Sequence, residues 1–216
     1  LDKKDMSAPT CNDCHGNHGA YPPEVKSVAS VCRQCHPSTG DLFNKSAHKK
    51  AFDDMGASEC EVCHGNHKIL PPSNAMLGTQ GPSVCIQCHD KGSAGFTAAG
   101  DLKALLDAFD ARTAAAGNVL SAAEKKGVDV SEPQFRLRDM ATIDIMAKNL
   151  VHGLNVADIR GKLEEAGPTL SAVEKAGTEA LGEANYRRRG LILATVLLAL
   201  FGLALFMKIR TMKKPE

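Results

Sequence analysis

The chain repeats one chemical motif, Cys-x-x-Cys-His, four times within its first 89 residues. The two thiols of this motif can add to the vinyl groups of haem, and the histidine that follows is then placed under the iron as its proximal ligand. The spacing therefore predicts four covalently bound haem c groups. The motif residues are Cys11, Cys14 and His15; Cys32, Cys35 and His36; Cys60, Cys63 and His64; and Cys85, Cys88 and His89.

Zinc binding is the main alternative, because paired Cys-x-x-Cys units can supply the four thiolates of a structural zinc site. A zinc ribbon does not require a histidine after each second cysteine, and here every motif has one. Disulfides are a third use of cysteine, but each of the eight cysteines already belongs to a motif. We therefore expect haem attachment.

Four histidines lie outside the motifs, one for each expected iron. A second axial histidine closes a haem iron and keeps its potential low, methionine raises the potential, and a vacant position permits catalysis. We expect four bis-histidine haems. The expected distal ligands are His18, His48, His67 and His152, and the substitutes, if one of these fails, are Met55, Met76 and Met140.

The composition of the motif region excludes some functions. The whole chain has a formal net charge of +1, and residues 1–92 carry nine Lys and Arg against ten Asp and Glu. Nucleic-acid binding requires a concentrated basic face, which this region lacks. The region has few large apolar side chains, so the porphyrins are expected to form its core and to lie close enough together for electrons to pass between them.

The motif region is an internal duplication of a two-haem unit. Residues 11–18 match residues 60–67, and each segment is followed by a Pro-Pro pair. The second motif of each unit matches as well, over residues 31–36 and 84–89. Proline and glycine between the motifs predict loops and short turns there.

After residue 96 the composition changes to Ala, Leu, Lys and Glu with helical periodicity. Apolar residues at three-and-four spacing predict two helices that pair as an antiparallel hairpin around a turn at residues 127–131. Ser131 and Gln134 predict a capping box at the start of the second helix. The two apolar stripes are Leu102, Leu105, Leu106, Phe109, Ala116, Val119 and Ala123; and Leu137, Met140, Ile143, Met146, Leu150 and Leu154.

A third amphipathic stretch is expected after a helix break at Gly167-Pro168, because the residue before proline disfavours helical geometry. This stretch either completes a three-helix bundle with the hairpin or forms a solvated linker helix. Its stripe is Leu170, Val173, Gly177, Leu181 and Ala184.

The spare histidines differ in how they can reach an iron. His18 and His67 each follow a proximal histidine by three residues, which is too close to reach the opposite face of the same porphyrin, so each is expected to bind a neighbouring haem. His48 joins the two duplicated halves. His152 lies where the second helix of the hairpin returns to the motif region, which makes it the expected ligand from outside that region.

Residues 190–207 carry no charge and span about 27 Å as a helix, enough to cross a bilayer core. Basic residues flank both ends, so the excess of Lys and Arg that normally marks the cytoplasmic side gives little information on the orientation of the helix. Haem c is attached outside the cytoplasmic membrane, and we therefore expect a single-pass inner-membrane protein with its haems in the periplasm. Leu1 is not an initiator methionine, and an export signal is expected to have been removed before it.

With the ligands and the anchor included, the chain resembles a membrane-anchored tetrahaem cytochrome c. Residues 11–89 are similar to the small periplasmic multihaem cytochromes of anaerobic respiration and, more loosely, to the tetrahaem quinol dehydrogenases of nitrate and nitrite respiration. The resemblance implies electron transfer between the membrane quinone pool and periplasmic partners. The quinol dehydrogenases have an N-terminal anchor, whereas the anchor expected here is C-terminal.

The expected fold is mainly α, with a loop-rich tetrahaem head built on a duplicated two-haem unit. A helical hairpin or three-helix bundle and one C-terminal transmembrane helix follow. The expected domains are residues 1–95 for the periplasmic tetrahaem cytochrome c domain, 96–189 for the hairpin or stalk, 190–207 for the transmembrane helix and 208–216 for the cytoplasmic tail.

These features predict an electron-transfer subunit of a larger complex, not an enzyme, with no catalytic residue. Its electrons are expected to pass between a quinol-oxidising membrane protein, such as a cytochrome b-type subunit, and periplasmic redox proteins. Two alternatives stay open: direct quinol dehydrogenation, and reduction of nitrite or hydroxylamine at a haem with a vacant position. Haem-based sensing is disfavoured because residues 208–216 are too few to signal unaided.

Overall fold

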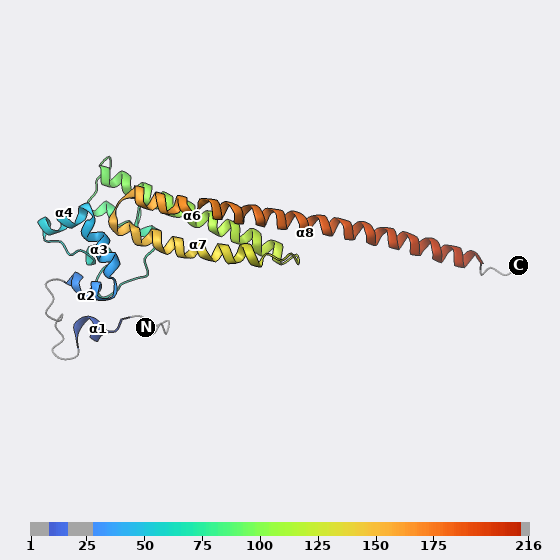
Figure 1. Cartoon of the computed structure of the whole chain (residues 1–216), viewed down its shortest axis with the longest axis horizontal. Helices are drawn as coiled ribbons and strands as arrows, with labels where there is room; N and C mark the ends of the chain where they lie inside the picture. Colours follow the sequence, from blue (N-terminus) through green and yellow to red (C-terminus); the bar gives the residue numbers. More distant parts are fainter. Residues whose placement is uncertain (1–8, 17–27, 213–216) are drawn as a thin grey trace. The chain divides into compact units, whose positions relative to one another are not determined.

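The computed structural model describes residues 9–16 and 28–212 (Figure 1). These residues are mainly helical, and none of them lies in a strand. The elements of the motif region are short: α1 Cys11–His15, α2 Val28–Cys35, α3 Pro37–Lys45, α4 Ala47–Met55, α5 Glu61–His64, η1 Asn74–Met76 and η2 Cys85–Gln87. The later elements are α6 Ala94–Glu124, α7 Ser131–Leu150, η3 Val151–Gly153 and α8 Val156–Met212.

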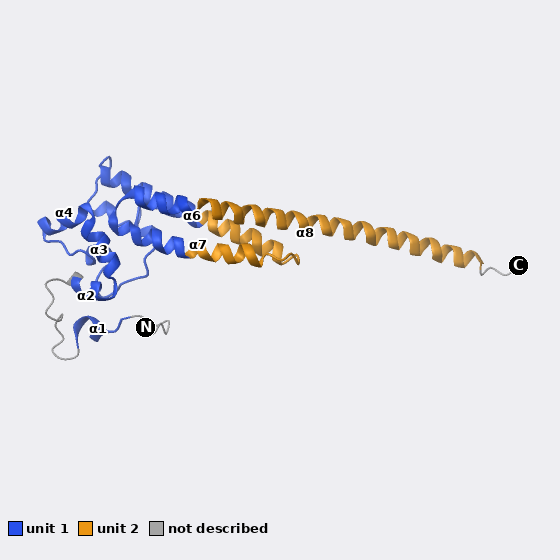
Figure 2. Cartoon of the chain, viewed as in Figure 1, with its two compact units in different colours: residues 1–110, 142–165 blue, residues 111–141, 166–216 orange. Residues whose placement is uncertain are grey.

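The chain divides into two compact units, which Figure 2 colours separately. The first unit comprises residues 1–110 and 142–165, and the second comprises residues 111–141 and 166–216. All four motifs therefore belong to the first unit, and the apolar end of α8 belongs to the second.

The core of the first unit forms where the long helices meet the motif region. Leu106 of α6 and Ile159 of α8 are fully buried in it. Leu77, from the motif region, packs against the same cluster. Complete burial of a leucine or isoleucine side chain contributes about 1.5–3 kcal/mol, so this core attaches the motif region to the helices. Its other members are Leu102, Ala147, Leu150, Val151, Val156 and Leu163.

A second contact in the first unit joins α3 to η3 and the end of α7. Thr39 Oγ1 donates a hydrogen bond of 2.7 Å to Asn149 Oδ1. A Cβ on Gly153 would lie 3.9 Å from Leu42 Cδ2, which is ordinary van der Waals distance. The contact holds η3, the element that carries His152, beside the motif region.

Residues 37–55 form two helices, so the prediction of only loops and short turns between the motifs is wrong here. Pro37 occupies the first turn of α3, where its missing N–H costs no hydrogen bond. α4 ends at Gly56, whose φ of 66° is the left-handed conformation that favours glycine. Phe43 and Phe52 pack edge to face with ring centroids 5.5 Å apart. Caps and an apolar pair, which composition does not reveal, stabilise both helices.

In the second unit, segments of α6, α7 and α8 pack against one another. A Cβ on Gly177 of α8 would lie 3.2 Å from Val119 Cγ1, so α6 and α8 approach closely at this glycine. The guanidinium of Arg112 donates to both carboxylate oxygens of Glu174, at 3.0 and 2.8 Å. The buried apolar side chains are Ala116, Leu120, Ala123, Val128, Val130, Met140, Ala166, Leu170, Val173 and Ala184.

α8 continues through Pro168, so the predicted break at Gly167-Pro168 is wrong. Proline disfavours helix at the preceding residue through clashes that include that residue's Cβ, and Gly167 has none. Ala166 and Leu170 are both buried, so packing on either side keeps this stretch helical.

The start of α7 also differs from the prediction. Asp129 Oδ1 accepts hydrogen bonds from the backbone N–H of Ser131 at 3.0 Å and from its hydroxyl at 2.6 Å. The side-chain amide of Gln134 instead donates to Glu124 Oε2 at 3.0 Å. The expected capping box is therefore absent at the start of α7. The carboxylate of Asp129, two residues before Ser131, accepts the hydrogen bonds of the Ser131 N–H and hydroxyl instead.

The C-terminal part of α8 is apolar, and no other described segment covers it. Its most apolar window has a mean hydropathy of 2.6, and none of that window is buried. Within residues 9–16 and 28–212, α8 is the one helix whose length and composition suit a membrane span. On these two properties alone, it suggests a membrane anchor.

Candidate functional site

Each motif folds as a helical turn, which places its two cysteines and its histidine on one face, since residues three and four apart are neighbours on a helix. The backbone N–H groups of His36, His64 and His89 donate to the carbonyl of the first cysteine of their motifs, at 2.9, 3.0 and 3.0 Å. No disulfide joins any two of the eight motif cysteines, all of which the structure describes. A motif in this conformation presents two thiols and an imidazole to the same group.

His64 of α5 and His152 of η3 form one imidazole pair, with ring centroids 6.0 Å apart and an interplanar angle of 21°. The Nδ1–H of His152 donates to the carbonyl oxygen of Asn149 at 2.9 Å. Because a carbonyl can only accept, this bond places the proton on Nδ1 and leaves a lone pair on Nε2. Metal-binding histidines are commonly oriented in this way.

Burial lowers the pKa of His64, and the nearby imidazoles of His152 and His36 lower it further. A lowered pKa favours the neutral ring, which is the form of histidine that binds a metal. The environment of this first pair therefore suits a ligand role.

His89 and His48 of α4 form a second pair, with ring centroids 5.7 Å apart and an interplanar angle of 77°. Their Nε2 atoms lie 3.5 Å apart. Phe52 packs edge to face against His48 at 5.6 Å between ring centroids. Burial, followed by the charge of His89, lowers the pKa of His48. The two Nε2 atoms thus face each other in a partly apolar setting.

His15 of α1 and His67 form a third pair, with ring centroids 5.9 Å apart and an interplanar angle of 6°. His15 belongs to the first motif, whereas His67 follows the third motif, in the other duplicated half. His67 thus lies beside a proximal histidine other than the one it follows in sequence.

The remaining expected ligands have no observed ring partner in the described part of the chain. His36 is exposed at the start of α3. His18 lies outside the described residues. Of the substitute methionines, Met55 is exposed on α4 and Met140 is buried in the second unit.

The spacing within the three pairs fits two axial imidazoles on one iron. A metal–imidazole bond is about 2 Å long, so two ligands on opposite sides have Nε2 atoms about 4 Å apart and ring centroids about 6 Å apart. The observed centroid distances are 5.7, 5.9 and 6.0 Å. The buried Nδ1 atoms of His15 and His48 have no hydrogen-bond partner among the described residues.

Comparison with known families adds a second line of support. Residues 3–91, which contain all four motifs, match the cytochrome c3 family. They form a cytochrome c3 domain. Such a domain implies covalent c-type haems and an extracytoplasmic location, and proteins of this family are typically electron carriers. No curated protein and no solved structure matches the chain.

Within the cytochrome c3 domain, the third motif lies between the second and the fourth. Burial and the neighbouring thiol of Cys32 raise the pKa of Cys60 to about 11. Burial and the thiols of Cys85 and Cys88 raise the pKa of Cys63. The third motif is therefore close to both of its neighbours, as an electron path through the domain requires.

A charged network holds the second and third motifs of the cytochrome c3 domain together. Glu59, directly before the third motif, pairs with Arg33 of the second motif and with Lys49 of α4, whose Nζ is 3.0 Å from Glu59 Oε1. Arg33 Nη2 also donates to Asn44 Oδ1 at 2.8 Å. The Glu59 side chain is only 14 % exposed and is shielded from solvent, whereas the side chains of Arg33 and Lys49 are 28 % and 30 % exposed. Sequence reasoning missed it, because the partners are not at helical spacing.

Two residues from outside the cytochrome c3 domain reach its histidines. One is His152, beside His64. The other is Gly95 of α6, where a Cβ would lie 2.2 Å from the Cε1 and Nδ1 atoms of His89. The helix can pass this close to the imidazole only because residue 95 has no side chain. The sequence singles out His152, but no motif points to Gly95.

Proposed function

We propose that the protein is an electron-transfer subunit of a membrane oxidoreductase complex. In this proposal, four bis-histidine haems of the cytochrome c3 domain carry electrons between a quinol-oxidising membrane partner and periplasmic redox proteins. The observation that supports it most is the pairing of three motif histidines with three histidines from outside the motifs, at 5.7 to 6.0 Å between ring centroids.

The proposed axial pairs follow from these contacts. Three pairs are the observed ring neighbours. The fourth pair is assigned by elimination, from the one motif histidine and the one spare histidine that remain. The pairs are His15 with His67, His89 with His48, His64 with His152, and His36 with His18. The eight motif cysteines would hold the four haems through thioether bonds.

When bound, haem c supplies a reversible one-electron change at its iron, and two imidazole ligands favour a low potential and leave no position for a substrate. The chain's own residues hold and orient these ligands. The carbonyl of Asn149 would keep the Nδ1 proton of His152 in place, which leaves Nε2 free to bind the iron. Phe52 packs beside His48 and restricts the orientation of its ring.

The proposed location is the periplasmic face of the inner membrane. Residues 190–207 would act as a single transmembrane anchor, with residues 208–216 in the cytoplasm. Anchoring keeps the cytochrome c3 domain at the membrane surface, which raises its effective concentration for a quinol-oxidising partner there. A cytochrome b-type subunit is the partner that suits this role.

Purification from native membranes in a mild detergent, followed by mass spectrometry, tests the proposed complex. We expect a quinol-oxidising subunit to copurify and quinol to reduce the haems only while that subunit is present. The purified chain alone is the control. Rapid reduction of this control by quinol would instead make the chain a quinol dehydrogenase, and a nitrite-sensitive high-spin signal would make it a reductase.

A further inference from the structure

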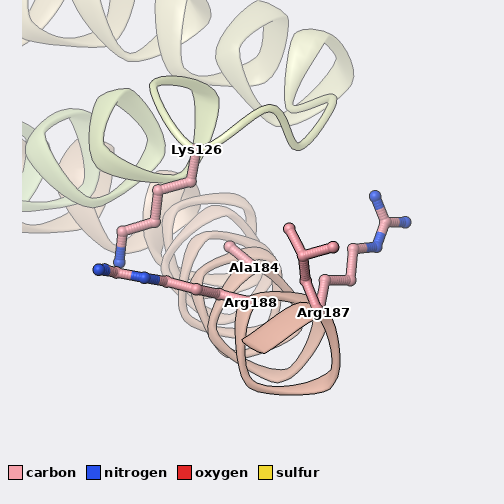
Figure 3. Close-up of a pocket in the computed structure, with 5 residues that line it drawn as sticks. Lys126, Ala184, Arg187 and Arg188 are labelled. Atoms are coloured by element: carbon pink, nitrogen blue, oxygen red, sulfur yellow. The ribbon is translucent and has the colours of Figure 1, made fainter. Parts of the chain in front are cut away.

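We propose that the second unit binds the phosphate of an anionic phospholipid in a basic pocket where α8 leaves the helical region. The basic pocket has a volume of about 310 Å³. It is lined by Lys126, Ala184, Arg187, Arg188 and Leu191 (Figure 3). The proposal rests on the proposed membrane anchor, but it does not depend on the identity of any redox partner.

The charge of the basic pocket favours an anion. Three of its five lining residues are cationic, and none of the described residues that line it carries a carboxylate. Arg187 is partly neutralised by Glu183, at 2.5 Å, and Lys126 Nζ donates only to the neutral amide oxygen of Asn185, at 2.9 Å. Two positive charges of the basic pocket, those of Lys126 and Arg188, are therefore left without a counter-charge.

Arg188 is the least satisfied of these groups. It makes no hydrogen bond or ion pair within residues 9–16 and 28–212. Lys126 and Arg188 extend toward one another in Figure 3, whereas Arg187 points away. Two cations that face each other without an intervening anion repel, and a bound phosphate would remove that repulsion.

The apolar wall of the basic pocket distinguishes a lipid from a free anion. Leu191 lines the pocket and is 69 % exposed. It also lies just inside the uncharged stretch 190–207. A ligand that fills the whole pocket therefore has an anionic group for the cations and an apolar part beside Leu191. A phospholipid at a membrane surface has both, and inorganic phosphate has only the first.

The position of Lys126 gives the site a consequence for the fold. Lys126 belongs to the turn between α6 and α7, where Gly127 has a φ of 80°. A headgroup bound between Lys126 and Arg188 would link this turn to α8 at the bilayer surface. The bound lipid would thereby hold the turn between α6 and α7 close to the start of the proposed membrane anchor.

Native mass spectrometry of the full-length haem-loaded protein in a neutral detergent tests this site. The probes are short-chain phosphatidylglycerol, short-chain phosphatidylcholine and inorganic phosphate. The test variant is Lys126→Gln with Arg188→Gln. The matched control is Arg136→Gln with Lys175→Gln, which removes the same charge from the same unit at residues that pair with Glu132 and Glu179. Unchanged haem and circular dichroism spectra show that both variants are folded.

We expect phosphatidylglycerol to bind more tightly than either other probe and the test variant to lose about 30-fold in affinity for it, since each basic residue near a headgroup contributes about fivefold. The control should change by less than about twofold. Equal affinity of the test variant and the natural protein would overturn the proposal. Displacement of the lipid by an equal concentration of inorganic phosphate would also overturn it, in favour of a simple anion site.

Discussion

The imidazole of His152 lies beside that of His64, with ring centroids 6.0 Å apart, although His64 belongs to the third motif and His152 follows α7. Both rings lie in the first unit, and Asn149 orients that of His152. Shared ligation of one iron by these two rings would connect the cytochrome c3 domain to the long helices by a metal bond as well as by packing. The helical region would then be part of the haem site.

Replacing His152 tests this connection. His152→Ala should convert about one quarter of the haem from low spin to high spin, because one of four irons loses its second imidazole. His152→Met should keep the haem low-spin and raise the potential of one haem, because a thioether favours the reduced iron. Quantitative electron paramagnetic resonance and a potentiometric titration measure both effects. An unchanged spectrum in the alanine variant would remove His152 from the ligand set.

Gly95→Ala should disturb the pair of His89 and His48. The new Cβ would overlap the His89 ring, so the ring or the start of α6 must shift, at a cost of about 1–3 kcal/mol in the free energy of unfolding. Gly161→Ala is the matched control, because a Cβ there meets nothing within 4 Å. It should stabilise α8 by about 0.5–1 kcal/mol. Equal free energies of unfolding for the two variants, measured with denaturant, would contradict the close approach of residue 95 to the His89 ring.

Leu106→Ala should lower the free energy of unfolding by about 2–5 kcal/mol, because it opens a cavity in the core that joins the helices to Leu77. Phe135→Ala is the control, since Phe135 is 60 % exposed on α7. Its effect should stay below about 1 kcal/mol, because the exposed ring loses chiefly its contact with the guanidinium of Arg138. A loss below about 1 kcal/mol for the Leu106 variant would mean that this core does not hold the unit together.

The ion pair of Arg112 and Glu174 should make stability depend on pH. Hydrogen bonds from Arg112 lower the pKa of Glu174. A lowered pKa in the folded state stabilises the fold above the ordinary value of about 4.3, and this contribution is lost as the pH falls through the folded pKa. Arg112→Gln should therefore lower the free energy of unfolding by at most about 1 kcal/mol near pH 7, because the pair is partly exposed.

The effect of Arg112→Gln should shrink as the pH falls below about 4.3 and vanish once the pH has passed through the lowered pKa of Glu174, because the carboxylate is then protonated even in the natural protein. Urea unfolding of the variant and the natural protein at several pH values measures the difference. Arg136→Gln, which removes a pair within a single helix, is the control and should change stability by about 0.3–0.5 kcal/mol at neutral pH. An Arg112 effect that grows toward low pH would contradict the assignment.

Ending the chain after residue 189 should release the protein from the membrane. The removed part of α8 has no buried residue in its apolar window, so the packed cores should remain intact. The shortened protein should appear in the soluble periplasmic fraction with the haem spectrum of the full chain. Retention in the membrane fraction after a high-salt wash would show that another surface attaches the protein.

Local spacing explains what could be predicted from the sequence. The motif turns depend on residues close together in the chain, and the structure shows them, whereas at the start of α7 the helix begins at Ser131 without the expected capping box. Leu170, Val173 and Ala184 are buried as their spacing predicts. In α7, by contrast, Met146 is exposed and Ala147 is buried, because a small residue suits a close helix contact better than its hydrophobicity indicates.

Features that depend on contacts between distant segments could not be predicted. Sequence counting matches four spare histidines to four irons, but only the folded structure shows which rings are neighbours. No spacing rule connects Glu59 to Arg33 or identifies Gly95 as the residue that faces His89. Continuation of α8 through Pro168 likewise depends on the burial of Ala166 and Leu170 on either side.

The presence of four bis-histidine haems is tested most directly by measuring the number of covalent haems and their spin state in the same purified full-length protein. Intact mass gives the number of covalent haems per chain, and electron paramagnetic resonance of the oxidised protein gives the share that is low-spin. We predict four haems per chain, all low-spin. Fewer than four haems, or a high-spin signal from one of them, would contradict four bis-histidine sites.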